Sequence, residues 1–219
     1  MLPNSLVMVR LIHLALAQIQ LIDNGESAST LQSFLGRVNY TFADKYLLTA
    51  SLRADGSSKF REDNRWGYFP SGSVAWRVSQ EGFMQDAQTI SNLKVRASYG
   101  ITGSQAIGIY ATRSRPLTGQ SYNYPFDGDL AYVGVAPSNR MPNPDLTWEQ
   151  TAQANVGFDL GLWDNKVSFS FDAYSKKTTD LLLNVTLPEF VGPTVMADNI
   201  GELTNKGFEF VLGWMPNLG

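Results

Sequence analysis

The sequence predicts an all-β fold: an antiparallel, up-and-down segment of a transmembrane β-barrel with about seven long strands. Three observations predict it. Apolar and polar side chains alternate along seven segments, as they do in a strand with one apolar and one polar face. The connections between segments alternate in length, which would place long loops at one end of the sheet and short turns at the other. Aromatic residues gather near the segment ends, where a barrel meets the two lipid–water interfaces.

Along the alternating runs of the seven segments the apolar face has no charged side chain, whereas the polar faces, taken together, carry charges of both signs. In "NKVSFSFDAYSKKT", for example, Val167 and Phe169 alternate with Ser168 and Ser170. This period of two is that of a strand. Several segments can be read to about 9–11 residues, the length that a tilted strand needs to cross hydrocarbon. The predicted strands span residues 36–42, 46–55, 72–79, 92–101, 150–162, 165–178 and 206–214.

The connections favour a barrel over a soluble sandwich. If neighbouring strands are antiparallel, every long connection falls at one end of the sheet and every shorter one at the other, as in transmembrane barrels. A sandwich would also have one apolar and one polar face, but it gives no reason for this alternation. The expected connections are short at 43–45 and 163–165, intermediate at 80–91, long at 56–72 and 177–206, and very long at 103–146.

The aromatic residues on the apolar side form two expected groups. Rings with an apolar body and a polar edge favour the lipid–water interface. One group is expected at the short-turn end and comprises Phe42, Tyr46, Trp76 and Trp214, and the other, at the long-loop end, comprises Tyr99 and Trp148.

Composition excludes several function classes. The formal net charge of −3 argues against nucleic acid as a partner. The chain has no cysteine and only one histidine, His13, so disulfides, thiolate catalysis and a multi-histidine metal site are excluded. No run of about 18 apolar residues predicts a spanning helix. The apolar opening of the chain makes a poor secretion signal because its first basic residue, Arg10, comes late.

Several motifs carry a family resemblance. The segment "SLRADGSSKFREDNRWGYFPSGSVAWRVSQEGFM" resembles the TonB-dependent outer-membrane transporters of the SusC/RagA class of Bacteroidetes. The resemblance continues through "SNLKVRASYGITGSQAIGIY", "MPNPDLTWEQTAQANVGFDLGLWDNKVSFSFDAYSKKTTDLLL" and "NIGELTNKGFEF". It implies two parts, an unassigned segment at 1–30 and a partial transporter β-barrel at 31–219. Arg61 is a departure, because the family often has glycine there.

The resemblance implies a function and a set of partners. Members of the family import oligosaccharides or peptides across the cell outer membrane by binding and translocation, without covalent chemistry, so neither an enzyme nor a cofactor is expected. The implied partners are outer-membrane lipid, a SusD-class surface lipoprotein, the TonB complex acting through a plug domain, and a glycan or peptide substrate. Family barrels have about 22 strands around that plug. Seven strands cannot close such a barrel, so we expect this chain to be a fragment.

Charged side chains on the polar faces are the first candidate site. They would line the barrel lumen and contact a plug or a polar solute; alternatively, they only solvate a water-filled interior. The lumen-lining candidates are Arg37, Arg53, Arg77, Lys94, Arg96, Asp159, Asp172 and Glu209.

Loop aromatics are the second candidate. Tyr122, Tyr124 and Phe126, in the longest loop, are the substrate-contact candidates because aromatic rings can stack on sugars; the alternative is packing between loops. Packing is the expected role of the aromatic residues in "RWGYFP", which are Trp66, Tyr68 and Phe69.

Acidic residues suggest two further chemistries, neither favoured. Asp145 and Glu149 could be a glycosidase pair, but no supporting residues accompany them, and loop hydrogen bonding is the expected role. Asp127 and Asp129 lack the rest of a calcium-loop pattern, so a polar turn is expected, with no metal. The alternative function to transport is a soluble secreted all-β carbohydrate-binding module, followed by a β-sandwich glycosidase.

Overall fold

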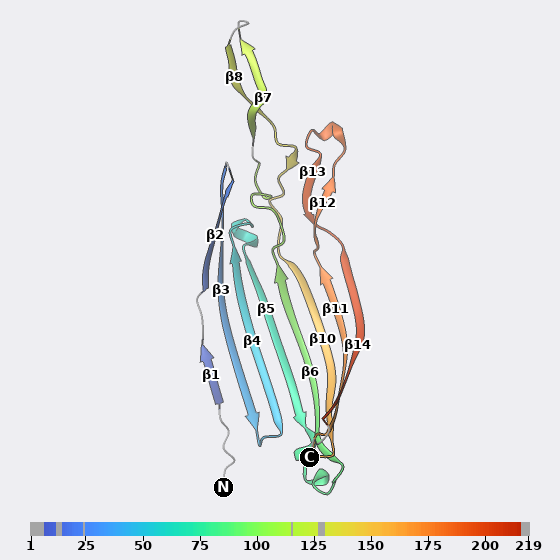
Figure 1. The fold of residues 1–219 in the computed structure, drawn as a ribbon. Helices are drawn as coiled ribbons and strands as arrows, with labels where there is room; N and C mark the ends of the chain where they lie inside the picture. The colour runs from blue at the N-terminus through green and yellow to red at the C-terminus, as the bar shows by residue number, and fades with distance from the viewer. Residues whose placement is uncertain (1–6, 12–14, 24, 115, 127–129, 216–219) are drawn as a thin grey trace.

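The computed structural model describes residues 7–11, 15–23, 25–114, 116–126 and 130–215, and the side chains of 28–114, 116–117 and 136–215. These residues form strands and short 3₁₀ helices, with one nine-stranded antiparallel sheet as the main element (Figure 1). No helix in the described part of the chain is long and apolar enough to cross a membrane.

All seven predicted strands are present, and they pair antiparallel with their neighbours in chain order. Most are longer than predicted, because pairing continues past the hydrophobic alternation into the loops. The seven strands are β3 (Gly25–Phe42), β4 (Tyr46–Ser57), β5 (Trp66–Arg77), β6 (Ile90–Ser104), β10 (Glu149–Leu162), β11 (Val167–Thr179) and β14 (Glu202–Trp214).

Two shorter strands line the outer edge of β3. β1 (Val7–Leu11) pairs with the short-turn half of β3, and β2 (Ala15–Asp23) pairs with its other half. The segment left unassigned by sequence therefore extends the same sheet. The division of the chain near residue 30 stays a prediction.

The ends of the sheet differ as predicted, with one correction. Tight turns at 43–45 and 163–166 close one end, and the two long connections lie at the other, which Figure 1 shows at the top. The expected long connection at 56–72 is wrong, because only residues 58–65 separate β4 from β5. This connection is shorter than the one at the short-turn end, where residues 78–89 join β5 to β6. Strand β5 starts at Trp66, before the predicted start at residue 72. Its side chains alternate between buried and exposed on both sides of Pro70, whereas a prediction from sequence ends the strand at a proline.

The two long connections contain strands of their own. A hairpin rises from the first, and a small sheet joins the second to the end of the first (Figure 1). These strands are β7 (Leu117–Phe126) and β8 (Leu130–Ala136) in the hairpin, and β12 (Leu182–Thr186), β13 (Val195–Asn199) and β9 (Arg140–Met141) in the small sheet.

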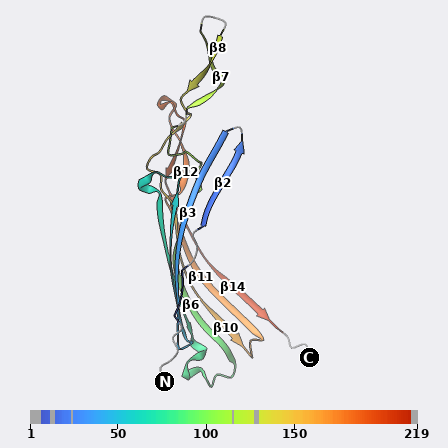
Figure 2. The same cartoon turned by 90° about the vertical axis from the view of Figure 1, so that its left-hand side faces the viewer.

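The apolar face of the main sheet is uncovered. Leu48, Val74 and Val156 are 48%, 52% and 57% exposed. Phe210, on β14, is 60% exposed. Seen from the side, no second layer of described residues lies against the sheet (Figure 2). An exposed apolar surface of this extent marks a site of contact with a membrane or with other protein.

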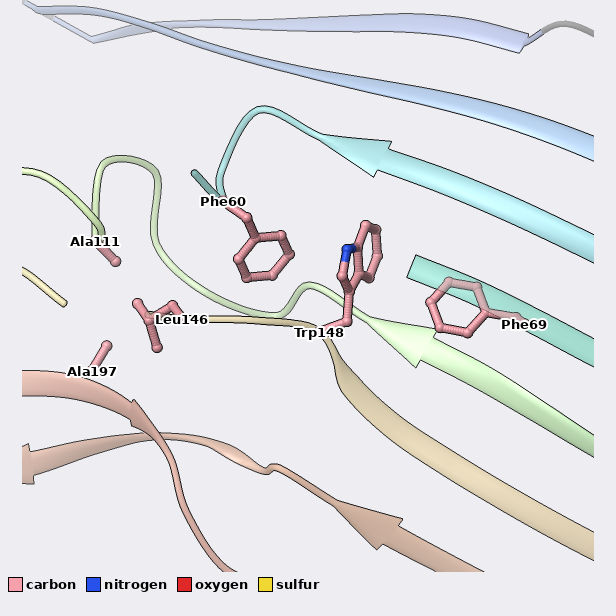
Figure 3. Close-up of a cluster of buried hydrophobic side chains, with 6 residues drawn as sticks. All are labelled: Phe60, Phe69, Ala111, Leu146, Trp148 and Ala197. Atoms are coloured by element: carbon pink, nitrogen blue, oxygen red, sulfur yellow. The ribbon is translucent and has the colours of Figure 1, made fainter. Parts of the chain in front are cut away.

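The buried core lies instead at the long-loop end (Figure 3). Trp148 is 3% exposed, with ring centroids 5.3 Å from Phe60 and 5.5 Å from Phe69. Placing Trp148 at the lipid interface is therefore wrong: it precedes β10, and its ring turns into the loops. Phe69 packs as expected, over a position where Gly103 has no side chain to obstruct the ring. The cluster comprises Phe60, Phe69, Ala111, Leu146, Trp148 and Ala197.

Aromatic rings form a ladder at the short-turn end. The rings of Phe42, Tyr46 and Trp76 stack in sequence, with centroids 6.3 Å and 6.4 Å apart. The Glu81 carboxylate accepts hydrogen bonds from Tyr46 Oη at 2.9 Å and Trp76 Nε1 at 3.1 Å, and it pairs with Lys45 Nζ at 2.8 Å. One carboxylate thus accepts hydrogen bonds from the polar edges of two rings. Tyrosine and tryptophan rings expected at a lipid–water interface need such partners for their polar groups.

The Glu81 interactions predict a pH-dependent stability. Hydrogen bonds from Lys45, Trp76 and Tyr46 lower the pKa of Glu81 from its usual 4.5 to about 2. A carboxyl group whose pKa is lowered by folding stabilises the fold fully above its unfolded pKa and loses that effect as pH falls through the folded pKa. In urea unfolding, wild type should exceed Glu81→Gln in stability at pH 6, and the difference should vanish near pH 2. A difference that persists unchanged at pH 2 would contradict this role.

Candidate functional site

The strand register places all eight predicted lumen-lining residues on the polar face of the sheet. Arg53 lies in its long-loop half, and Arg37 pairs with Ser51 near the middle of the face. The other six lie together in the short-turn half, in two adjacent rows that run across the strands. One row contains Arg77, Lys94 and Asp159, and the next contains Arg96, Asp172 and Glu209.

Arg96 is the centre of an ion cluster in these rows. Its Nη2 lies 2.6 Å from Asp172 Oδ2 and 3.1 Å from Asp159 Oδ1, and its Nε donates to Asp159 Oδ2 at 3.2 Å. Ser170 Oγ donates to Asp159 Oδ1 at 2.9 Å. The guanidinium therefore holds two carboxylates in fixed positions, one of them with both oxygens.

The cluster spans three strands because Gly157 lies between Arg96 and Asp172 in the register. A Cβ at this position would collide with Asp172 Oδ1 and come within 2.5 Å of the backbone oxygen of Phe171. The absent side chain lets Arg96 and Asp172 meet across β10.

Gly157→Ala is expected to destabilise the chain by about 1–3 kcal/mol, because the methyl group must displace Asp172 or the β11 backbone. The matched control is Gly36→Ala on β3, where a Cβ meets nothing within 4 Å. That variant should be neutral or stabilising by up to about 1 kcal/mol. Urea unfolding of both variants in detergent measures the difference, and equal effects at the two glycines would contradict the packing at Gly157.

A polar groove of about 600 Å³, lined mainly by serine, threonine, arginine, asparagine and glutamine residues, lies across the middle of the same face. Ser51 and Ser71 share a hydrogen bond of 2.7 Å across two strands. Arg53 pairs with Asp55 at 2.8 Å and lies 5.5 Å from the centre of the Phe69 ring. The groove thus offers the hydroxyl groups of Ser51 and Ser71 and the Arg53 guanidinium, all held in place by neighbours and able to form hydrogen bonds.

The described residues contain no group of three or more histidine, cysteine, aspartate or glutamate side chains placed to hold a metal ion. Glu149 Oε2 accepts a hydrogen bond from the Leu182 backbone at 3.2 Å, and the Asp145 backbone bonds Asn143 and Asn64. The Glu149 carboxylate and the Asp145 backbone therefore take part in loop hydrogen bonds, the role expected from the sequence.

The remaining aromatic and acidic candidates have different outcomes. Trp66 stacks on Phe34 at 5.9 Å, which confirms packing, whereas Tyr68 is 62% exposed. The backbones of Tyr122, Tyr124 and Phe126 lie on β7, but their side chains lie outside the described part of the structure. Asp127 and Asp129 lie outside the described residues. Substrate contact by the three aromatics stays a prediction.

Sequence reasoning missed Gly157 and Ser170 in the ion cluster and the serine pair in the groove. Each of these residues contributes through the residue beside it on the neighbouring strand. Alternation along one strand reveals which face a residue is on, but not which residue lies beside it. Only the pairing register could have found them.

The chain matches the family model described as "TonB dependent receptor-like, beta-barrel" over residues 17–219. It is 44% identical over 180 residues to TonB-dependent receptor P3 of Formosa agariphila, covering 82% of this chain and 18% of the relative. It is 40% identical over 193 residues to TonB-dependent receptor SusC of Bacteroides thetaiotaomicron, covering 86% and 19%. The chain thus spans less than a fifth of the length of these curated relatives.

Solved structures agree with this match. The structure of the RagAB peptide transporter superposes with a TM-score of 0.79 at 30% identity, covering 89% of this chain and 21% of that one. The siderophore receptor PirA of Pseudomonas aeruginosa superposes with a TM-score of 0.58 at 13% identity, which shows a shared fold.

Proposed function

We propose that this chain, which belongs to the family of TonB-dependent receptor β-barrels, forms part of the wall of a nutrient importer. Proteins of this family lie in the outer membrane, and so does this chain. The observation that carries the proposal is the contrast between the two faces of one uncovered sheet. One face exposes apolar side chains such as Val156, and the other carries the Arg96 cluster and the polar groove.

The open edges of the sheet support a wall rather than a complete pore. Among the described residues, β14 has one neighbour, β11, so its other edge offers unpaired backbone groups. Such groups cost several kcal/mol each in hydrocarbon. In the proposed importer, further strands pair at this edge and along β1 and β2.

The proposed mechanism is binding and translocation without covalent chemistry. The polar face would contact a plug and the passing solute. TonB would supply the energy, and a SusD-class lipoprotein would lie at the outer surface. The RagAB structure, named as a peptide transporter, supports a peptide as one solute class, and the SusC relative supports the same transport role. No observation favours the soluble carbohydrate-binding module, whose apolar face would need a cover that the described residues do not provide.

A chimaera tests the proposal. This chain replaces the matching segment of the SusC relative, and outer-membrane insertion and uptake of that relative's own solute are measured. Both should be retained. Val156→Lys should abolish insertion by placing a charge in lipid, whereas Asn155→Lys, one residue along and on the polar face, should be tolerated. Equal tolerance of the two lysines would contradict a barrel wall.

A further inference from the structure

A second polar pocket, of about 750 Å³, lies at the long-loop end, apart from the groove on the polar face. Its walls come from three segments: residues 61–65 between β4 and β5, residues 112–114 after β6, and Pro142 and Pro144 before β10. Nothing in the proposed function assigns it a role.

Hydrogen bonds between the three walls preform this pocket. Thr112 Oγ1 donates to the Lys59 backbone oxygen at 3.3 Å, and Asn64 Nδ2 donates to the Asp145 backbone oxygen at 3.0 Å. The backbone of Asn143 bonds that of Ala111 at 3.3 Å. Phe60 and Ala111, which adjoin two of the walls, belong to the buried cluster (Figure 3). A ligand would therefore meet walls already in place, which lowers the cost of binding.

The pocket lining carries unpaired charges of both signs. Arg61, Arg65 and Arg113 face it together with Glu62 and Asp63, and within the described residues none of the five takes part in an ion pair. Arg65 Nε is buried and has no hydrogen-bond partner. A buried donor without a partner is rare.

Arg61 is one of the three arginines that line the pocket. Its backbone is extended, with φ of −73° and ψ of 168°, so the position does not require glycine and holds an arginine without strain. Arg61 therefore adds a cation to the pocket without straining the turn.

We propose that this pocket binds a peptide that carries both carboxylate and ammonium groups. The arginine forks match carboxylates, and Glu62 and Asp63 accept the ammonium. An anionic glycan would satisfy the arginines but would meet two unpaired carboxylates, which disfavour it by repulsion. This inference rests on the proposed import function and names its solute class.

Calorimetric titration of the full chain in detergent, with the peptide Glu-Ala-Ala-Lys as the probe, tests the inference. Arg61→Gln and Glu62→Gln should each weaken binding roughly 10-fold, since each removes one charge-assisted contact. Lys166→Gln, in the turn at the opposite end of the sheet, should leave binding unchanged. Circular dichroism of each variant verifies that the sheet is intact.

Two comparison ligands decide the solute class. Tetra-alanine with acetylated and amidated ends should not bind, and trigalacturonate should bind at least 10-fold more weakly than the peptide. Trigalacturonate binding as tightly as the peptide, with Glu62→Gln without effect, would overturn the peptide assignment. Absence of any peptide binding would overturn the pocket itself. Failure of the chimaera to insert, with peptide binding intact, would instead refute the proposed import function.

Discussion

Replacing Trp148 by alanine is expected to destabilise the long-loop end by about 3–5 kcal/mol, the largest effect of any single change considered. The side chain is 3% exposed and lies between the Phe60 and Phe69 rings. Its Nε1 donates to the Arg65 backbone oxygen at 3.1 Å, and this oxygen also accepts from the Ser57 backbone. The substitution removes the central ring of the cluster and one hydrogen bond between connections.

Hydrogen exchange measures this effect by region. Amides at 105–114 and 142–148 should exchange much faster in Trp148→Ala, because these connections pack on the cluster, whereas those in the centre of β11 should not change. The matched control is Trp163→Ala, which removes a tryptophan that is 54% exposed in a tight turn at the other end. Faster exchange along the whole sheet, or equal effects of the two substitutions, would contradict a separate loop core.

Asn199→Ala is expected to destabilise the connection between β11 and β14 by roughly 2–4 kcal/mol, the sum of three lost hydrogen bonds. Asn199 Oδ1 accepts from the Thr147 backbone at 2.8 Å, and its Nδ2 donates to the backbone oxygens of Thr147 at 3.0 Å and Asp180 at 2.9 Å. One amide thus joins two connections that are distant in sequence.

The effect should appear as faster amide exchange at Thr147 and Ile200, the residues held beside Asn199. Asn205→Ala is the control, because its side chain is exposed on β14 and has no hydrogen bond within the described residues. Equally fast amide exchange at Thr147 and Ile200 in both variants would contradict the role of the Asn199 amide in joining the two connections.

The sequence predicted the strands well because alternation depends only on neighbours along the chain. All seven strands and their order follow from it, as does the polar face that carries Arg96. Features set by contacts between distant segments were not predictable in this way. The ion cluster requires the register that places Gly157 between Arg96 and Asp172.

Each misreading of the sequence has a local cause. Pro70 hid the first part of β5, because proline within a run usually argues against a strand. Trp148 was assigned to the lipid interface because it lies near a strand end, yet it precedes β10 and joins a core formed by three connections and β5. Strands β12 and β13 were read as loop because five-residue strands give too little alternation to be recognised.

The central claim is that the apolar face of the sheet contacts lipid and the other face contacts water. Because the chain has no cysteine, single-cysteine variants can carry a fluorophore at Val156 on the apolar face or at Asn155 on the polar face. In lipid bilayers, a quencher attached to acyl chains should dim the label at Val156, and aqueous iodide should dim the label at Asn155. Iodide reaching Val156 while the lipid quencher does not would contradict the claim.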